Sequence, residues 1–322
     1  MTSRFSAVPH GIEYLSIEKT ERVNRLRKTV AEAFSKAKFV EIIPPMVDYA
    51  TTFLLTGGKS AEDVFEFKDA SGEHLALRSD LTVQILKAAI TGRLGQNLPS
   101  RYYYLQRVFK DYRPGTGRYR EISQAGVEWI GYDKPDRFDI LFELACNTLD
   151  ALNQPYRFLY GDVRFVDSLL SFVNESKRSE ITEALYFKDV GRLGQLAVNL
   201  GLNQKQKRLL AEAPLLVGSL STLDKLSDLC SGFPELLKII EESPKRKELI
   251  YDFTSVRQLS YYSGPVIEAY LHQSNRRILS GGFYDQLSKR FHEDETAIPA
   301  AGFAIDLNEL IHLADNNNDT KD

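Results

Sequence analysis

Two stretches of the chain show the alternation of hydrophobic and polar positions that is typical of β-strands. Residues 101–110 are rich in aromatic and β-branched side chains, and residues 121–131 alternate polar with apolar positions. Because side chains two apart in a strand share a face, Gln124 and Glu128 are predicted to point the same way. The same alternation places Ser123 outward. The pattern predicts a hairpin that presents an amide and a carboxylate on one face.

The segment between these strands is predicted to be a basic loop. Pro114, Gly115 and Gly117 interrupt the strand pattern and turn the chain. Between Arg101 and Arg120 there are six Lys or Arg residues and a single acid. One interpretation is a solvated, positively charged hairpin. The other is a binding site, because cations beside an amide and a carboxylate suit an amino acid, alone or with a nucleotide. The loop cations are Lys110, Arg113, Arg118 and Arg120.

Hydrophobic spacing predicts the remaining elements. Residues 16–38 are predicted to form an amphipathic helix with an apolar stripe of Val23, Leu26, Val30 and Phe34. A helix over residues 81–94 follows Asp80, and aspartate commonly caps helices. Residues 167–247 are Leu-rich and helical in pattern, and residues 250–310 return to strand character. The other predicted elements are strands 39–45 and 156–163, a hairpin of strands 64–68 and 74–78, and a helix over 135–152.

The composition is that of a cytosolic globular protein. The 322 residues are 43% hydrophobic and 26% charged, and the sequence has neither a signal peptide pattern nor a membrane-spanning run. The net charge of -3 argues against a general nucleic-acid binder. Cys146 and Cys230 lie in apolar helical surroundings, which favours free buried thiols over a disulfide. The five histidines lack paired spacing, so we predict no metal site and no cofactor.

The hairpin also resembles motif 2 of the class II aminoacyl-tRNA synthetases in its histidyl form. That motif consists of an aromatic strand, Phe-Arg, a loop with Pro and Gly-Arg-x-Arg, and then Gln-x-Gly-x-Glu. The matching residues here are Phe109-Lys110, Pro114, Gly117-Arg118-Tyr119-Arg120 and Gln124-Ala125-Gly126-Val127-Glu128. Their order and spacing are far more specific than a lone glycine motif.

Other segments resemble further parts of the same family. Residues 77–82 are similar to Leu-Arg-Pro-Glu-x-Thr, with Arg78, Asp80 and Thr82 in register. Residues 256–268, VRQLSYYSGPVIE, resemble the histidine-binding signature Val-Arg-Gly-Leu-Asp-Tyr-Tyr-x-Gly-x-Val-Phe-Glu. Two later matches are to Gly-Gly-Gly-Arg-Tyr-Asp and to motif 3, at residues 280–285 and 302–310. The helix and strand within residues 16–45 resemble motif 1, which forms the dimer interface in that family.

The resemblance covers nearly the whole chain and implies its architecture. The expected fold is α+β, a class II synthetase-like antiparallel sheet flanked by helices. Residues 1–166 and 248–315 would form two parts of one core, residues 167–247 a helical insertion, and residues 316–322 a flexible tail. The chain stops soon after motif 3, so we expect no counterpart of the synthetases' C-terminal anticodon-binding domain.

The resemblance also implies a pocket for histidine. Asp80, Thr82 and Gln124 would take the ammonium group, and Arg257 would pair with the carboxylate. A charged acceptor such as Glu128 suits an imidazole N–H. The residues assigned in this way are Asp80, Thr82, Gln124, Glu128, Arg257, Tyr261, Tyr262 and Tyr284.

The nucleotide half of the synthetase site departs from the family pattern. Lys110 replaces the motif 2 Arg, and lysine keeps the charge but loses the bidentate fork. Tyr112 replaces an acid on the adenine side of the loop. Glu309 replaces the motif 3 Arg and reverses the charge where a polyphosphate would lie, and Phe283 replaces the Arg of Gly-Gly-Gly-Arg-Tyr-Asp. We therefore expect a site that binds histidine and activates it poorly.

A tail-less, synthetase-like chain of this kind resembles the regulatory subunits of ATP phosphoribosyltransferase, the first enzyme of histidine biosynthesis. The resemblance implies a non-catalytic cytoplasmic chain that forms a homodimer, assembles with a short catalytic subunit, supports its activity and carries histidine feedback. No membrane or nucleic-acid partner is expected. Two alternatives stay open. One is a histidine-activating, ATP-dependent ligase or degenerate synthetase, and the other is a nucleic-acid-binding module built on the basic loop.

Overall fold

The structure is a computed structural model that describes residues 7–54, 63–95, 97–254, 261–272, 276–291 and 296–311. In these residues the centre of the fold is an eight-stranded sheet of order β1-β5-β6-β11-β10-β9-β7-β8. Its strands are β1 (Val40–Glu41), β5 (Ser100–Phe109), β6 (Glu121–Ile130), β11 (Ala300–Asp306), β10 (Arg277–Phe283), β9 (Pro265–Leu271), β7 (Tyr156–Asp162) and β8 (Leu249–Tyr251).

The sheet is mixed at its two edges. The strands from β5 to β7 pair antiparallel with their neighbours, whereas β1 joins β5 and β8 joins β7 in parallel. The sequence predicted the α+β class and the flanking helices correctly, but the antiparallel description holds only for the six inner strands. A second sheet has the order β2-β4-β3, formed by β2 (Val47–Tyr49), β4 (His74–Leu77) and β3 (Glu66–Lys68).

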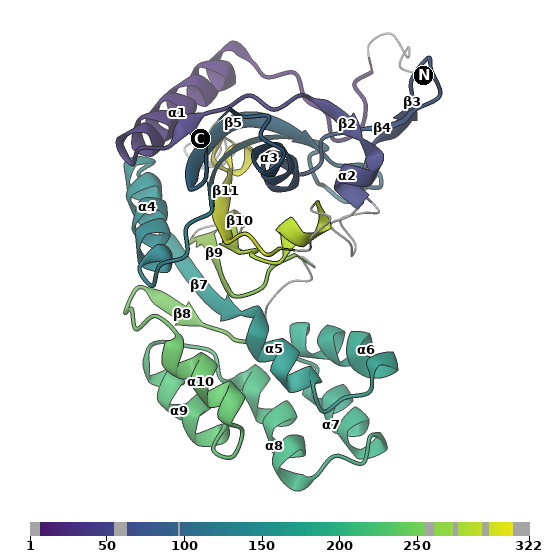
Figure 1. Ribbon diagram of the computed structural model, residues 1–322, viewed down its shortest axis with the longest axis vertical. Coiled ribbons are helices and arrows are strands. Elements are labelled where there is room, and N and C mark those ends of the chain that lie inside the picture. The colour runs from purple at the N-terminus through teal and green to yellow at the C-terminus, as the bar shows by residue number, and fades with distance from the viewer. Residues whose placement is uncertain are drawn as a thin grey trace, which may run out of the picture.

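Helices cover both faces of the large sheet. The ribbon shows α1 (Ile17–Lys36) and α4 (Arg137–Ala151) on its outer side and α3 (Leu81–Ile90) inside its curve (Figure 1). Helix α1 begins where the Ser16 side chain accepts a hydrogen bond from the Lys19 N–H, and its predicted apolar stripe packs inward. A shorter helix, α2 (Ala50–Leu54), packs beside the small sheet.

The two faces of the large sheet border different interiors. Trp129 and its face of β6 pack with α1 and α4 in the larger hydrophobic core, while Tyr104 faces α3 in a second cluster. The strand register places Glu128 beside Gly302 on the α3 face, and Gln124 on the same face. The shared face of Gln124 and Glu128 is therefore confirmed, and it is an interior face.

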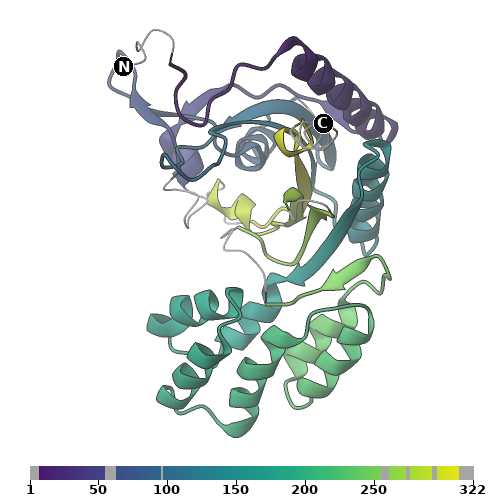
Figure 2. The same cartoon turned by 180° about the vertical axis from the view of Figure 1, so that it is seen from behind.

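The helices between β7 and β8 gather at one end of the molecule, below β8 in Figure 1 and again in the reverse view of Figure 2, whereas the 3-10 helix η3 (Leu287–Arg290) lies between β10 and β11 in the chain. They follow one another between β7 and β8, as the Leu-rich pattern predicted. The first of them begins directly after β7. The division of the chain into separate domains stays a prediction. These helices are α5 (Val163–Leu170), α6 (Glu175–Tyr186), α7 (Val190–Asn199), α8 (Gln204–Glu212), the 3-10 helix η2 (Ala213–Leu215), α9 (Ser221–Leu229) and α10 (Pro234–Glu242).

Some predicted elements differ in extent from the observed ones. The strand expected over residues 39–45 is only two residues long, because Pro44 and Pro45 have no N–H to continue the ladder. Helix α3 ends at Ile90 rather than at residue 94. Ser123, which the alternation placed outward, is buried because helices cover both faces of the sheet.

Other features of the described chain agree with the sequence. The hairpin of β3 and β4 pairs antiparallel as predicted. Cys146 and Cys230 are free thiols, and burial raises their pKa to about 11 and about 12, so both are unreactive at neutral pH. No helix in the ranges that the structure describes combines the length and the apolar character needed to cross a membrane.

Candidate amino-acid binding site

Glu128 is the centre of a polar cluster under α3. Its side chain is almost fully buried, and the hydroxyl of Thr82 donates a hydrogen bond of 2.6 Å to Oε1. The hydroxyl of Tyr284 donates to Oε2. Burial raises the pKa of Glu128 to about 8, although both hydroxyl donors oppose the shift, and the nearby charge of Asp80 adds to it. The carboxyl is thus mostly protonated at pH 7 and passes to its charged form near pH 8.

Asp80 serves both the helix and the cluster. Its Oδ1 accepts the Val83 N–H at 3.4 Å and caps α3. Its Oδ2 accepts a hydrogen bond of 3.2 Å from the Tyr261 hydroxyl. Asp80 therefore caps α3 and also supplies a hydrogen-bond acceptor close to Glu128.

Glycines on the sheet let aromatic rings lie close to the backbone. A Cβ at Gly126 would lie 2.3 Å from the Tyr104 hydroxyl oxygen, and one at Gly282 would lie 3.1 Å from the ring of Tyr262. The Tyr104 hydroxyl donates to Gln124 Oε1 at 3.4 Å. Gly302 in β11 is the register partner of Glu128, and a Cβ there would lie 2.3 Å from Glu128 Oε2. The glycine positions of the motifs are therefore steric requirements of this pocket.

The structure brings together every described residue that the sequence assigned to histidine. Asp80, Tyr262 and Glu128 lie close enough that the carboxylate charges of the first and last help to raise the tyrosine pKa, after burial. Thr82, however, donates to Glu128 and not toward the group expected at Asp80. Arg257 lies outside the described residues. The assignment to histidine stays a prediction, supported by the clustering of Asp80, Thr82, Gln124, Glu128, Tyr261, Tyr262 and Tyr284.

The four cations of the basic loop separate into two groups. Lys110 is half-buried, and burial lowers its pKa, while the charge of Asp80 opposes that shift. Arg113 is exposed, and the Arg118 guanidinium lies 5.0 Å from the ring centre of Tyr112. Of these three cations, Lys110 is therefore the one that interacts with a residue of the Glu128 cluster, Asp80.

Arg120 is part of the structure that holds the loop. Its guanidinium forms an ion pair with Asp111 and lies 4.4 Å from the ring centre of Phe65. Its backbone N–H donates to Gly11 at 2.7 Å, and the Gly115 N–H donates to the ring of His10 at 2.8 Å. The N-terminal arm thus fixes the loop, which the sequence gave no reason to expect.

Carboxylates occupy the place of the motif 3 cation. Glu309 accepts hydrogen bonds from Arg276 at 3.1 Å to both oxygens. Asp306 pairs in register with Gln124, and burial, followed by the charge of Glu309, raises its pKa to about 7. The cation Arg277 is engaged by Glu268. Glu309 and Glu268 are thus each paired with an arginine, and the position of the motif 3 arginine holds a carboxylate in place of a cation that could bind a polyphosphate.

Phe283 lies on the other face of the sheet. Its partner in the register is Ala301, which belongs to the outer core, and the Arg137 guanidinium lies 3.9 Å from its ring centre. The side chain of Phe283, which stands where the family has an arginine, therefore points away from the Glu128 cluster. The departures that bear on a nucleotide are those at Lys110, Tyr112 and Glu309.

Arg137 supports the site from the other face of the sheet, and the sequence did not reveal it. It is buried at the start of α4 and forms two hydrogen bonds to the Asp285 carboxylate, at 2.8 and 3.0 Å. The Asp285 N–H donates to the Ser263 hydroxyl at 2.9 Å, so the chain next to Tyr284 is fixed on both sides. The two partners are 148 residues apart, and no local pattern connects them. Tyr104 was missed for another reason, since it looked like an ordinary strand aromatic.

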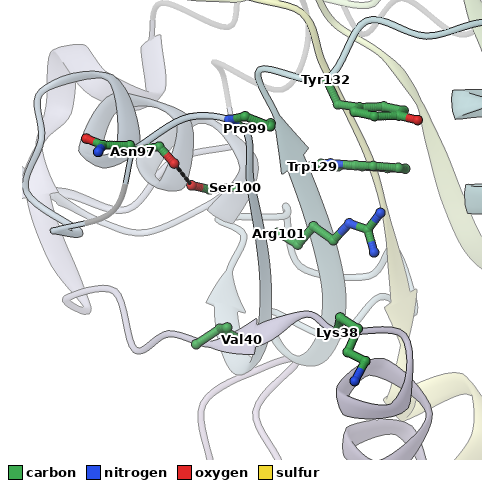
Figure 3. Close-up of a pocket in the computed structure, with 8 residues that line it drawn as sticks. All are labelled: Lys38, Val40, Asn97, Pro99, Ser100, Arg101, Trp129 and Tyr132. Atoms are coloured by element: carbon green, nitrogen blue, oxygen red, sulfur yellow. Dashed lines mark hydrogen bonds between the residues drawn. The ribbon is translucent and has the colours of Figure 1, made fainter.

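A surface groove of about 590 Å³ lies elsewhere (Figure 3). The Arg101 guanidinium lies 4.1 Å from the ring centre of Trp129, and Trp129 stacks on Tyr132 at 4.0 Å. Trp129 follows Glu128 directly in β6, so its ring points to the opposite face. The groove is thus separate from the Glu128 cluster.

Comparison with known proteins places this geometry in a family. The sequence profile described as histidyl-tRNA synthetase matches residues 11–310. The chain belongs to the histidyl-tRNA synthetase family. The resemblance that the motifs indicated is therefore confirmed, and with it the class II fold.

Curated relatives narrow the resemblance. A protein from Leptospira interrogans (serogroup Icterohaemorrhagiae, serovar copenhageni) is 29% identical, over 94% of this chain and 92% of the relative. One from Syntrophotalea carbinolica is 26% identical, over 96% of this chain and 74% of the relative. Both are named ATP phosphoribosyltransferase regulatory subunit.

Solved structures agree on the fold. A protein from Bacillus halodurans described as an ATP phosphoribosyltransferase regulatory subunit/histidyl-tRNA synthetase has a TM-score of 0.83 at 22% identity, covering 97% of this chain and 84% of the other. Histidyl-tRNA synthetase from Nostoc has a TM-score of 0.78 at 18% identity, over 97% and 76%. At these identities the similarity is one of fold.

Proposed function

We propose that this chain is the regulatory subunit of ATP phosphoribosyltransferase, that it binds free histidine in the Glu128 pocket, and that it carries feedback to a separate catalytic subunit in the cytoplasm. The observation that carries the proposal is that the described residues for the amino acid are in place, whereas those for the nucleotide depart from the family pattern. The amino-acid half is assembled around Glu128, while the nucleotide half has Glu309 paired with Arg276. The names of the curated relatives support the same role.

The chemistry of the pocket matches the groups of histidine. Asp80 and Gln124 offer acceptors for an ammonium group, and Glu128 accepts from hydroxyls that an imidazole N–H could join. A ligand cation or N–H donor favours the charged form of Glu128, whose pKa is raised by burial. Histidine binding is therefore expected to release a proton near neutral pH. Arg257 is proposed to pair with the ligand carboxylate.

Calorimetry with free histidine tests the pocket directly. The purified chain should bind histidine, and the heat should depend on the ionisation enthalpy of the buffer, because a proton is released. Histamine has no group in place of the carboxylate, and histidinol has an uncharged hydroxymethyl group there. Both should therefore bind more weakly than histidine. An absence of heat and of thermal stabilisation at millimolar histidine would show that the pocket assignment is wrong.

An enzyme remains the second candidate, since Phe283 is remote from the pocket and Lys110 keeps a cation beside Asp80. In that case the chain would activate histidine with ATP. Histidine-dependent exchange of labelled pyrophosphate into ATP measures this activity. We expect none, because Glu309 stands where the family has the motif 3 arginine and is itself paired with Arg276, so that position offers no cation to a polyphosphate. Steady exchange above that of a Glu128→Gln control would favour the enzyme.

A further inference from the structure

Arg137 is a buried cation on the face of the sheet opposite the Glu128 cluster. It is the first residue of α4 and is only 4% exposed. Its guanidinium lies 3.9 Å from the ring centre of Phe283 and donates to both oxygens of the Asp285 carboxylate, at 2.8 and 3.0 Å. Two parallel hydrogen bonds of this kind fix the orientation of a carboxylate, because the guanidinium is a planar, rigid fork.

Tyr284 lies just beyond the end of a strand, so the sheet alone does not fix its ring. Strand β10 ends at Phe283, whose register partner in β11 is Ala301. Tyr284 and Asp285 follow in the turn before η3. The placement of the Tyr284 ring therefore depends on contacts outside the strand ladder.

Asp285 and Tyr284 both bond to the backbone of Ala300. Asp285 Oδ1 accepts the Ala300 N–H at 2.8 Å as well as one N–H of Arg137. The Tyr284 N–H donates to the Ala300 carbonyl at 2.9 Å. Ala300 begins β11, which pairs with β6, the strand that carries Glu128. The ion pair of Arg137 with Asp285 thus holds the turn against the sheet on which the pocket is built.

The hydroxyl of Tyr284 is the part of this turn that reaches the pocket. Tyr284 is 1% exposed, and its hydroxyl donates to Glu128 Oε2. The ring of Tyr261 lies edge-on to it, with 6.1 Å between the ring centres. The steps from Arg137 through Asp285 and Tyr284 to Glu128 are therefore each a direct contact or a covalent link.

We propose that Arg137 is a positioning residue for the effector pocket, whose ion pair with Asp285 holds the Tyr284 hydroxyl on Glu128 and so sets the affinity for histidine. The inference rests on the proposed function, because the effector is taken to be histidine. Arg137 itself does not touch the ligand, since it packs on Phe283 at the outer core. A guanidinium is required, because an ammonium group cannot bond both carboxylate oxygens in the same planar arrangement.

The first test is a double-mutant cycle between Arg137→Lys and Tyr284→Phe, measured by urea unfolding of the full chain without histidine. Lysine keeps the cation and loses the planar pair, and phenylalanine removes only the hydroxyl. If the ion pair holds that hydroxyl on Glu128, Tyr284→Phe should lower the urea midpoint less in the Arg137→Lys chain than in the wild type. Equal shifts in the two chains overturn the inference, because the ion pair would then stabilise the fold independently of Tyr284.

The second test is the affinity for histidine, measured by calorimetry. Arg137→Lys should raise the histidine Kd by about 3- to 30-fold, and should change it by less than about twofold when Tyr284→Phe is already present. Arg246→Lys is the matched control, because Arg246 also pairs with an aspartate of α4, Asp139. That control should leave the Kd within about twofold of the wild-type value.

A variant of the other partner covers the case in which Arg137→Lys does not fold. Asp285→Asn keeps the size of the side chain and one acceptor oxygen, and removes the charge that pairs with Arg137. It should raise the histidine Kd over the same range, and both its effect on the Kd and its coupling in urea should depend on the Tyr284 hydroxyl.

The outcomes separate the inference from the proposed function. If the wild type binds no histidine, the proposed function fails and the claim on affinity fails with it, while the urea cycle still decides whether the ion pair holds Tyr284. If the wild type binds histidine, an unchanged Kd for Arg137→Lys and Asp285→Asn overturns the role of Arg137 alone. An equal loss of affinity with and without the Tyr284 hydroxyl also overturns it, because the effect would then not pass through Tyr284.

Discussion

Glu128 shows how one buried side chain can hold both the structure and the chemistry of a pocket. It receives hydroxyl hydrogen bonds from α3 through Thr82 and from the chain after β10 through Tyr284. Removing its charge keeps its shape, so Gln is the informative replacement. The residue was predicted from strand alternation, but its burial was not, because a carboxylate on a strand usually faces solvent.

Glu128→Gln should weaken histidine binding by about 1–3 kcal/mol, because a charged acceptor is exchanged for an amide. The measurement is the shift in melting temperature with histidine concentration, for wild type and variant. Glu121→Gln is the matched control, since Glu121 is in the same strand but pairs with Arg107 near the surface. Equal loss in both variants would contradict a specific role for Glu128.

The raised pKa of Glu128 also predicts how stability depends on pH. The folded chain keeps a proton on this carboxyl up to about pH 8, whereas the ordinary value of 4.5 applies in the unfolded chain. The unfolded state therefore loses that proton first, and the free energy of unfolding should fall as the pH rises from 4.5 to 8. Urea unfolding at several pH values should show a shallower fall for Glu128→Gln.

Asp306 contributes in the same direction, because its pKa is raised to about 7, so part of the slope will persist in the variant. Parallel pH profiles for wild type and Glu128→Gln would contradict the assignment of a protonated Glu128.

At the scale of elements, close approach of strands and rings defines the pocket. A Cβ at Gly302 would lie 2.2 Å from the Val127 carbonyl oxygen and 2.3 Å from Glu128 Oε2. Such contacts were not predicted from the sequence, in which these glycines served only as matches to the family motifs. Of the strand pairings, the sequence predicted the two hairpins, β5 with β6 and β3 with β4.

Gly302→Ala should lower the free energy of unfolding by about 1–3 kcal/mol through overpacking, and should weaken histidine binding as well. Gly194→Ala is the control, because Gly194 lies in helix α7 with nothing within 4 Å of a new Cβ. That control should raise stability by up to about 1 kcal/mol through helix propensity. Urea unfolding of both variants measures the difference, and a neutral Gly302→Ala would contradict the steric account.

The sequence predicted elements well where a periodic pattern was long. Helix α1 and strands β5 and β6 were located within two residues, since their patterns extend over ten or more positions. The parallel pairing of the edge strands β1 and β8 was not predicted, because strands of two or three residues carry no pattern that fixes their partner. The sequence treated the cations of the basic loop as one group, whereas in the structure Arg120 pairs with Asp111, Lys110 is half-buried and Arg113 is exposed. Pairs distant in sequence, such as Arg137 with Asp285, leave no local signal.

At the scale of the molecule, the β1 edge of the large sheet carries exposed apolar side chains. Ile43 is 78% exposed, and a cluster of this kind on one edge suits association. Val40 in β1 and Met46 after it are also exposed, as are Val47 and Tyr49 in the next strand, β2 of the small sheet.

We expect a homodimer through this edge, as motif 1 implies for the family. Ile43→Lys should give monomers, because a charge would be buried at the interface, whereas Val198→Lys, at an exposed site on α7, should leave the dimer intact. Sedimentation velocity at micromolar concentration measures both. A monomeric wild-type chain would contradict the proposed dimer.

If the chain is a regulatory subunit, histidine bound to it must change catalysis in another polypeptide. That effect is a coupling free energy, typically about 1–3 kcal/mol, transmitted through an interface. A reduced effector affinity must therefore shift the inhibition curve toward higher histidine, by about tenfold for each 1.4 kcal/mol.

The most direct measurement is a histidine titration of phosphoribosyl transfer to ATP by the reconstituted complex, with wild-type chain or Glu128→Gln. Each rate is expressed relative to the histidine-free rate of the same complex. We expect the wild-type complex to be inhibited at histidine concentrations near its calorimetric Kd, and the curve for Glu128→Gln to be shifted about 5- to 150-fold higher, the range of 1–3 kcal/mol. Superimposed curves would contradict it, because feedback would then be sensed outside this pocket.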